Sequence, residues 1–134
     1  MQSKWSDREA ARFVERYGAD WGEDLALRIY LAGLIGSEED LVLHGGGNTS
    51  VKTVFRNILG DRVPVLYVKA SGLNMAAIEP EGYIRLDLEH LRRLRSLERL
   101  SEDEMLEILF GMTGFKDEYH GSLSFLKHLL ECPD

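Results

Sequence analysis

The chain has 134 residues, 44% of them hydrophobic, so it is long enough to bury one core and too short for two domains. Its formal net charge of -7 excludes a general nucleic-acid-binding surface, because a phosphate backbone requires clustered positive charge. No apolar run approaches the roughly 18 to 20 residues of a membrane span, and no signal-peptide core is present. The single cysteine, Cys132, allows no disulfide within the chain. We therefore expect one cytoplasmic domain without a nucleic-acid or membrane partner.

The first two segments are predicted to be helices. Ser6 and Glu9 have the spacing of a capping box, and apolar residues recur at helical spacing after them. A second, broadly apolar helix follows Gly22 and is expected to end at Gly36 and Ser37. The first helix is expected to bury one stripe, and the second to bury most of its surface.

Four extended segments are predicted next. Residues 41–43 form a short apolar run, and residues 50–55 alternate well enough to be a strand. Residues 57–62 are expected to connect this strand to a central strand at 63–68, which is rich in β-branched and aromatic residues. Residues 83–87 predict another short strand.

The remaining segments are predicted to be helical. Leu88, Leu91 and Leu94 lie on one side of a helix that follows the last strand. Ser101 and Glu104 form a second capping box, which predicts a helix continuing to about residue 112. The pattern weakens beyond residue 114, although residues 123–130 are consistent with a final short helix.

The most informative motif is the glycine triplet at residues 45–47, which is followed by Asn48, Thr49 and Ser50. Glycines allow the backbone to adopt positive φ and its N–H groups to approach an anion closely. A second loop of small residues, residues 69–72, follows the predicted central strand. Two such loops at strand ends favour a shared ligand site over a polar connection between strands.

Two lysines near these loops, Lys52 and Lys69, are candidates for added positive charge. The alternation of side chains along a strand also allows both of them to point to solvent. Neither lysine is therefore counted among the predicted binding residues.

Three segments of the chain resemble the class II aldolase/adducin family in both order and spacing. They are residues 43–52, residues 68–72 and residues 78–83, and the resemblance covers about residues 5–105. It is strongest to the aldolase portion of the bifunctional rhamnulose-phosphate aldolase/alcohol dehydrogenase type. The resemblance implies a single partial domain over residues 1–134, in which residues 106–134 form a diverged tail.

The resemblance also implies a fold and a binding site. The fold is α/β, a truncated three-layer α/β/α arrangement whose mainly antiparallel sheet is flanked by helices. In this family the corresponding loops hold the phosphate or polar end of a sugar-derived substrate. Amide and hydroxyl groups on glycine-rich turns donate several hydrogen bonds to such an oxyanion. The implied phosphate- or substrate-binding residues are Gly47, Asn48, Ser50, Ser71, Gly72 and Ser122.

The departures from the family concern catalysis. A zinc-dependent class II aldolase needs a catalytic carboxylate, a His-x-His pair and a later histidine, and zinc then stabilises an enediolate. The chain contains no His-x-His, and Ser124 occupies the position of the carboxylate when Ser122 is aligned with the family's third loop. We therefore expect no catalytic residue, no metal ligand and no cofactor in this chain. Its four histidines are His44, His90, His120 and His128.

Three functions remain open. The first is a non-catalytic aldolase-like domain that retains a phosphate or sugar-phosphate loop. The second is half of a zinc-dependent sugar-phosphate aldolase, completed by another chain or by further sequence. The third is an adducin-like interaction module. Because a truncated sheet exposes an unpaired edge, we also expect a homo-oligomer.

Overall fold

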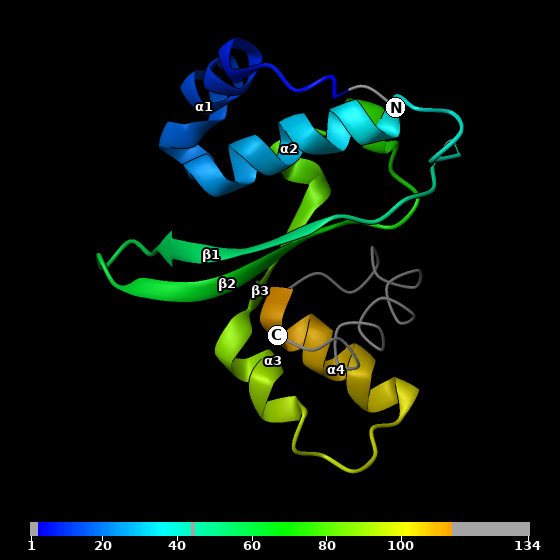
Figure 1. Cartoon of the computed structure of the whole chain (residues 1–134). Coiled ribbons are helices and arrows are strands. Elements are labelled where there is room, and N and C mark those ends of the chain that lie inside the picture. The colour runs from blue at the N-terminus through cyan, green and yellow to red at the C-terminus, as the bar shows by residue number, and fades with distance from the viewer. Residues whose placement is uncertain (1–2, 44, 114–134) are drawn as a thin grey trace.

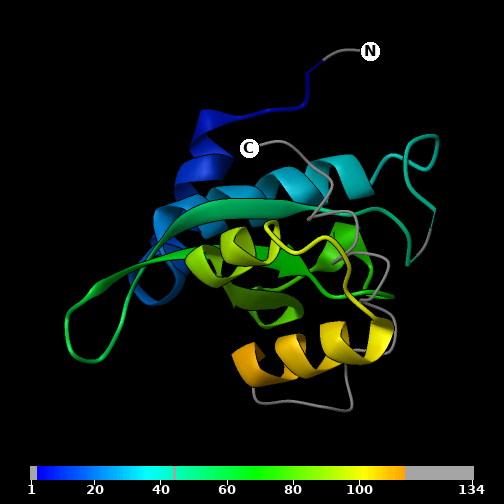
Figure 2. The same cartoon turned by 90° about the horizontal axis from the view of Figure 1, so that it is seen from below.

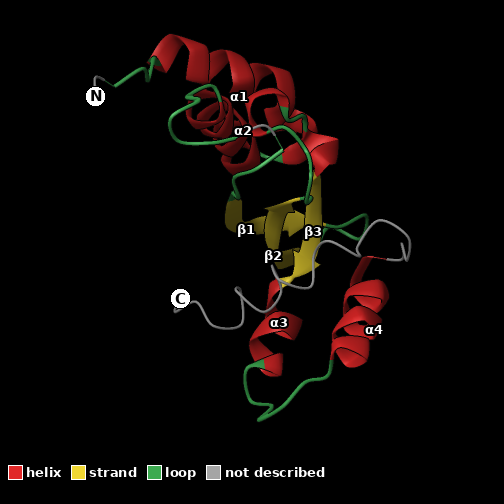
Figure 3. Ribbon diagram, turned by 90° about the vertical axis from the view of Figure 1, so that its right-hand side faces the viewer, coloured by secondary structure: helices red, strands yellow, loops and turns green. Residues whose placement is uncertain are grey.

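A three-stranded antiparallel sheet lies between two layers of helices (Figure 1, Figure 3). The computed structural model describes residues 3–43 and 45–113. Helices α1 (Asp7–Trp21) and α2 (Glu23–Gly36) cover one face, and α3 (Leu88–Leu94) and α4 (Glu102–Thr113) cover the other. The predicted three-layer α/β/α arrangement with a mainly antiparallel sheet is therefore confirmed. None of the described helices is both long and apolar enough to cross a membrane.

The sheet has the strand order β1-β2-β3. Strand β1 (Ser50–Arg56) pairs with β2 (Arg62–Lys69), and β2 pairs with β3 (Tyr83–Asp87). The sequence pattern predicted all three strands to within one residue at each end, and it placed β2 at the centre. Two short 3-10 helices, η1 (Met75–Ala77) and η2 (Pro80–Gly82), connect β2 to β3 and were not predicted.

The predicted strand at residues 41–43 is wrong. The N–H groups of Leu41 and Val42 donate to the carbonyl of Glu38 at 2.9 and 3.0 Å, which folds this run into a turn after α2. The side chains of Leu41 and Leu43 are 55% and 81% exposed. Three apolar residues do not specify a strand on their own, because the carbonyl of Glu38 offers the N–H groups of Leu41 and Val42 a nearer acceptor.

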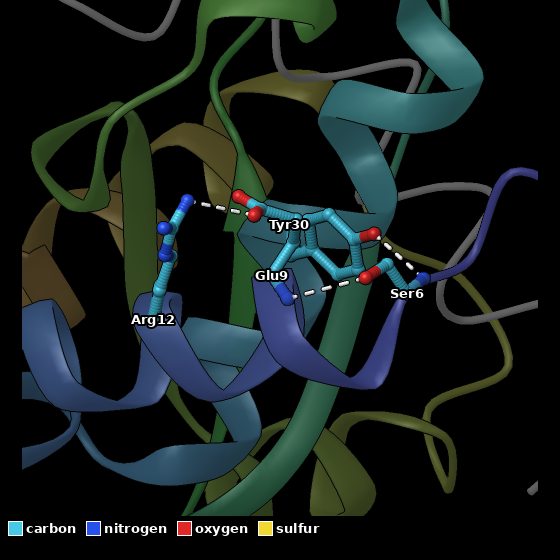
Figure 4. A network of polar contacts seen from close by, with 4 residues as sticks. All are labelled: Ser6, Glu9, Arg12 and Tyr30. Atoms are coloured by element: carbon cyan, nitrogen blue, oxygen red, sulfur yellow. Dashed lines mark hydrogen bonds and ion pairs between the residues drawn. The ribbon is translucent and has the colours of Figure 1, made fainter.

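The start of α1 is fixed by contacts that only partly match the predicted capping box (Figure 4). The Ser6 hydroxyl accepts from the N–H of Glu9 at 3.4 Å, as expected. The Ser6 N–H, however, donates to the Tyr30 hydroxyl at 3.0 Å, and the Glu9 carboxylate accepts from Arg12 at 2.7 Å. The tyrosine on α2 therefore replaces Glu9 as the acceptor, which ties the two helices together.

The side chains of β2 alternate between two hydrophobic cores. Val65 and Tyr67 belong to the core against α1 and α2, whereas Leu66 and Val68 belong to the core against α3 and α4. This alternation is expected for a strand that is covered on both faces. The first core also contains Tyr17, Leu25, Ala26, Ile29, Ala32, Met75, Ile78 and Tyr83; the second also contains Leu86, Leu88, Leu91 and Met105.

The hairpin between β1 and β2 projects beyond the helices (Figure 2). The side-chain oxygen of Asn57 accepts from the N–H groups of Leu59 and Asp61, both at 2.9 Å, and Gly60 has a φ of 87°. Ile58 and Leu59 are 102% and 81% exposed. The turn is therefore formed by its own polar groups and by a glycine, without a contribution from its two apolar side chains.

The last two helices both begin at a side-chain cap, of which only the one at Ser101 was predicted. The Asp87 carboxylate accepts from the N–H of His90 at 2.9 Å at the start of α3. At the start of α4, the Ser101 hydroxyl accepts from the N–H of Glu104 at 3.2 Å, and the Glu104 carboxylate accepts from the Ser101 N–H at 2.8 Å. This second capping box is reciprocal, as predicted. The helix predicted at 123–130 lies outside the described residues, and the division of the chain into one partial domain with a diverged tail stays a prediction.

Candidate anion-binding site

The glycine loop between α2 and β1 depends on the absence of side chains. Gly45 and Gly47 both have a φ of 74°, a conformation that residues with a Cβ rarely adopt. A Cβ on Gly47 would lie 2.9 Å from Cγ1 of Val42 and 3.1 Å from Sδ of Met75. The glycine triplet correctly predicted positive φ, whereas the close packing of the loop backbone onto Val42 and Met75 was not predicted.

The polar residues of this loop lie at the start of β1. The Asn48 side chain is exposed, and its oxygen accepts from the N–H of Thr49 at 2.9 Å. This bond uses the oxygen, so the NH2 group is the part of Asn48 that can donate to a ligand. Ser50 is half-buried and pairs with Val68. Because Val51 packs against the α1 and α2 core, Ser50 lies on the opposite face of the sheet.

The second loop follows β2 and reaches the first. Ser71 and Gly72 are exposed, and Gly72 has a φ of 80°. A Cβ on Gly45 would lie 3.4 Å from the carbonyl oxygen of Gly72, so the two loops lie close together. The N–H of Lys69 also donates to the carbonyl of Thr49 at 2.9 Å. The start of β1 and the end of β2 are at the same end of the sheet in Figure 1.

Among the described residues, Lys69 is a charged residue that is buried. Its side chain is only 4% exposed, and its ammonium group donates to the carbonyl of Ala70 at 3.1 Å. Burial lowers the pKa of Lys69, because a low-dielectric environment disfavours the charged form. The alternative that Lys69 points to solvent is therefore wrong, whereas Lys52 is exposed as that alternative allowed. Lys69 lies on the face of the sheet that helix α2 covers. Alternation along the strand assigns a residue to a face, but it does not show that a helix covers that face.

The sequence reasoning missed two polar side chains beside the loops, Arg28 on α2 and Tyr83 at the start of β3. The Tyr83 side chain is 5% exposed, and burial raises the pKa of its phenol, while Thr49 and the positive charge of Arg28 oppose the increase. Arg28 is the one charged residue in the apolar run 25–35, which was a usable signal. Tyr83 was interpreted as the beginning of a strand and as the end of the third family-like segment, and not as part of a site.

The histidines cannot be assembled into a metal site from the described residues. His90 is exposed on α3, and within residues 3–43 and 45–113 no three His, Cys, Asp or Glu side chains are placed to hold a metal ion. The described residues therefore do not fit a zinc ion. His44, His120 and His128, together with the predicted binding residue Ser122, lie outside the described residues.

Comparison with a solved structure decides the fold. The chain aligns with the N-terminal class II aldolase domain of a conserved protein from Thermoplasma acidophilum with a TM-score of 0.69 and 28% identity, over 99% of this chain and 56% of that one. The chain has the fold of part of a class II aldolase domain. No protein-family model matches it. The predicted resemblance to class II aldolases is confirmed by this structural match.

One curated protein is similar in sequence to this class II aldolase-like chain. It is "Uncharacterized oxidoreductase YuxG" from Bacillus subtilis (strain 168), which is 33% identical over 81 residues, or 60% of this chain and 12% of the relative. The chain thus spans about half of the Thermoplasma structure and a small part of the Bacillus protein. The name of the relative mentions no aldolase, so the finer resemblance to the rhamnulose-phosphate type stays a prediction.

Proposed function

We propose that this class II aldolase-like chain binds a phosphate or sugar-phosphate group through its two glycine-containing loops. The binding residues are Gly47, Asn48, Ser50, Ser71 and Gly72, with Ser122 as a further candidate from outside the described residues. The observation that carries the proposal is the closeness of the loops, since a Cβ on Gly45 would lie 3.4 Å from the carbonyl oxygen of Gly72. Groups from both loops can therefore reach one small ligand.

The chemistry of these loops supports an anionic ligand. The NH2 group of Asn48 and the hydroxyl of Ser71 are exposed hydrogen-bond donors at the surface of the two loops. Lys69 adds a positive charge at the end of β2, two residues before Ser71, where burial weakens the screening of its field. Hydrogen bonds to an ionised acceptor are roughly twice as strong as neutral ones.

The proposal is limited to ligand binding and assigns no zinc-dependent step to the described residues. Polarisation of a substrate carbonyl in a class II aldolase depends on the metal, and the described residues offer no ligand set for it. We therefore assign no catalytic residue, and the loops act by holding and orienting the phosphate group.

Amide NMR signals test this function directly. Inorganic phosphate and dihydroxyacetone phosphate, titrated separately at constant ionic strength, are expected to shift the signals of Asn48 and Ser71 saturably. Asn48→Ala is expected to weaken the apparent affinity by about tenfold, because a hydrogen bond to a charged ligand is lost. Ser96→Ala is the matched control, since Ser96 is exposed after α3, on the other side of the sheet from α2. Silent loop signals with both ligands would overturn the proposal.

A second candidate function follows from the length of the match. The chain corresponds to 56% of the Thermoplasma structure, so zinc ligands and a catalytic carboxylate supplied by another chain, by further sequence or by an oligomeric partner would complete an aldolase site. Purified protein that holds stoichiometric zinc and cleaves a sugar phosphate would favour this candidate. Phosphate binding without zinc would favour the first.

A further inference from the structure

The hairpin between β1 and β2 exposes two features that do not stabilise the chain itself. Its apolar tip consists of Ile58 and Leu59, which take no part in forming the turn. At its base lies an arginine pair, Arg56 and Arg62, whose members are exposed and directly opposite each other across the two strands. Like charges in directly opposed positions of a sheet are destabilising. Exposed apolar side chains beside arginines are typical of protein–protein interfaces.

The hairpin carries an excess of positive charge. None of the ion pairs found between described residues includes Arg56 or Arg62. The one carboxylate of the segment 56–62, Asp61, accepts from the side-chain amide of Asn57 at 3.1 Å. Two arginines and one carboxylate leave one positive charge, so the surface that suits this hairpin is both apolar and acidic.

The turn after α2, residues 38–43, exposes apolar side chains elsewhere on the molecule. Leu41 and Leu43 are exposed, while Val42 between them packs against the core of α1 and α2. This turn and the hairpin lie at opposite ends of the sheet in both Figure 1 and Figure 2. The hairpin of a chain therefore cannot reach its own turn, and only the turn of another copy is available to it.

The same turn also carries negative charge. Glu39 and Asp40 are exposed, and neither belongs to an ion pair found between described residues. Glu38, which begins the turn, is paired with Lys4. The turn is thus opposite to the hairpin in charge, and both surfaces add exposed apolar side chains.

Other contacts between two copies bring like charges together. Contact of two hairpins places the arginine pair of each copy against that of the other. Antiparallel pairing of two β1 edges about Val54 places Lys52 opposite Arg56. The apolar hollow on α3 that Leu97 lines is also lined by Arg93, which repels the arginine pair. The 38–43 turn therefore suits the hairpin better than these surfaces do.

We propose that copies of this chain associate head to tail, with the hairpin of one copy seated on the 38–43 turn of the next. The apolar tip packs against Leu41 and Leu43. The arginine pair lies against Glu39 and Asp40. Both surfaces are small, so each contact is weak. Because every contact leaves one hairpin and one turn unused, the copies close into a ring or extend into a chain.

Sedimentation velocity at concentrations up to about 1 mM tests the contact. The wild-type chain is expected to associate as its concentration rises, and added salt is expected to weaken the association by screening exposed charges. The tip variant, Ile58→Ser with Leu59→Ser, is expected to weaken the association by about tenfold or more. Leu97→Ser is the matched control, because it removes an exposed leucine away from both surfaces. A wild-type chain that stays monomeric would overturn the proposal.

Mixing two variants distinguishes a head-to-tail contact from a symmetric one. The turn variant, Leu41→Ser with Leu43→Ser, is expected to lose association as the tip variant does. Each variant retains the surface that the other lacks, so an equal mixture is expected to form one-to-one pairs and no larger species. A mixture that stays monomeric, or a turn variant that associates like the wild type, would contradict the head-to-tail contact. Circular dichroism shows whether each variant is folded.

A charge exchange tests the ionic part of the contact separately. Reversing the arginine pair to glutamates is expected to weaken association, and so is reversing Glu39 and Asp40 to arginines. A chain that carries all four reversals is expected to regain association, because hairpin and turn are again opposite in charge. Failure of the exchanged chain to associate would rule out the ionic contact. None of these substitutions changes a residue of the proposed phosphate site, so the two proposals are tested independently.

Discussion

The two faces of the sheet bury different kinds of side chain. Toward α3 and α4, the core is made of leucine, valine and methionine side chains. Toward α1 and α2, the apolar core continues into a region that contains Lys69, Tyr83 and Arg28, close to the two glycine loops. Polar groups in a low-dielectric interior lower stability unless they are fully paired. The difference indicates that one face is built for stability, whereas the other gives up some stability beside the candidate site.

The largest effect is expected from truncating the apolar face. Leu86 is 2% exposed, so Leu86→Ala is expected to lower the free energy of unfolding by about 2–5 kcal/mol, through lost burial and the cavity that remains. Both tryptophans, Trp5 and Trp21, lie in or next to α1 and report on the opposite face. Chemical denaturation followed by tryptophan fluorescence and by circular dichroism should give the same lowered midpoint. Different midpoints would show that the two layers unfold separately.

Substitutions at two glycines of α2 test how tightly this helix packs on η1, on the other face of the sheet. A Cβ on Gly36 would lie 2.5 Å from the backbone nitrogen of Ala76, whereas a Cβ on Gly33 would lie 3.6 Å from its oxygen. Gly36→Ala is therefore expected to destabilise the protein by about 1–3 kcal/mol, because η1 must move. Gly33→Ala is the control, and the helix propensity of alanine is expected to raise stability slightly. Equal midpoints in thermal denaturation would contradict the packing of α2 on η1.

The third effect is similar in size to that of Gly36→Ala and has the opposite sign. Lys69→Met removes a buried positive charge and is expected to raise the free energy of unfolding by roughly 1–3 kcal/mol at neutral pH. The pKa of Lys69 is lower in the folded chain than in the unfolded one, so the unfolded state binds more protons between the two values. Raising the pH from the folded pKa toward the unfolded one therefore relieves the penalty, and the advantage of the variant shrinks. If the stability advantage of Lys69→Met did not change with pH, the buried charge of Lys69 would not be its cause.

Local structure was more predictable than the contacts between segments. Alternation in β1 to β3 and the caps at Ser6 and Ser101 specified elements, because these signals depend on neighbours within a few residues. The glycine triplet correctly indicated positive φ. The positions of the two loops at strand ends also indicated that the loops lie close together. The partnerless groups of Arg28 and Tyr83 depend on residues far apart in the sequence, so no local pattern could show them.

The hairpin at residues 57–61 has a practical consequence for the experiments above. Asn57 forms the turn through its own amide, and the side chains of Ile58 and Leu59 do not contribute to it, so substitutions of these two side chains should leave the register of β1 and β2 intact. The turn lies at the end of the sheet opposite the two loops. A spin label or fluorophore attached at residue 58 would therefore serve as a distance reference that ligand binding does not disturb.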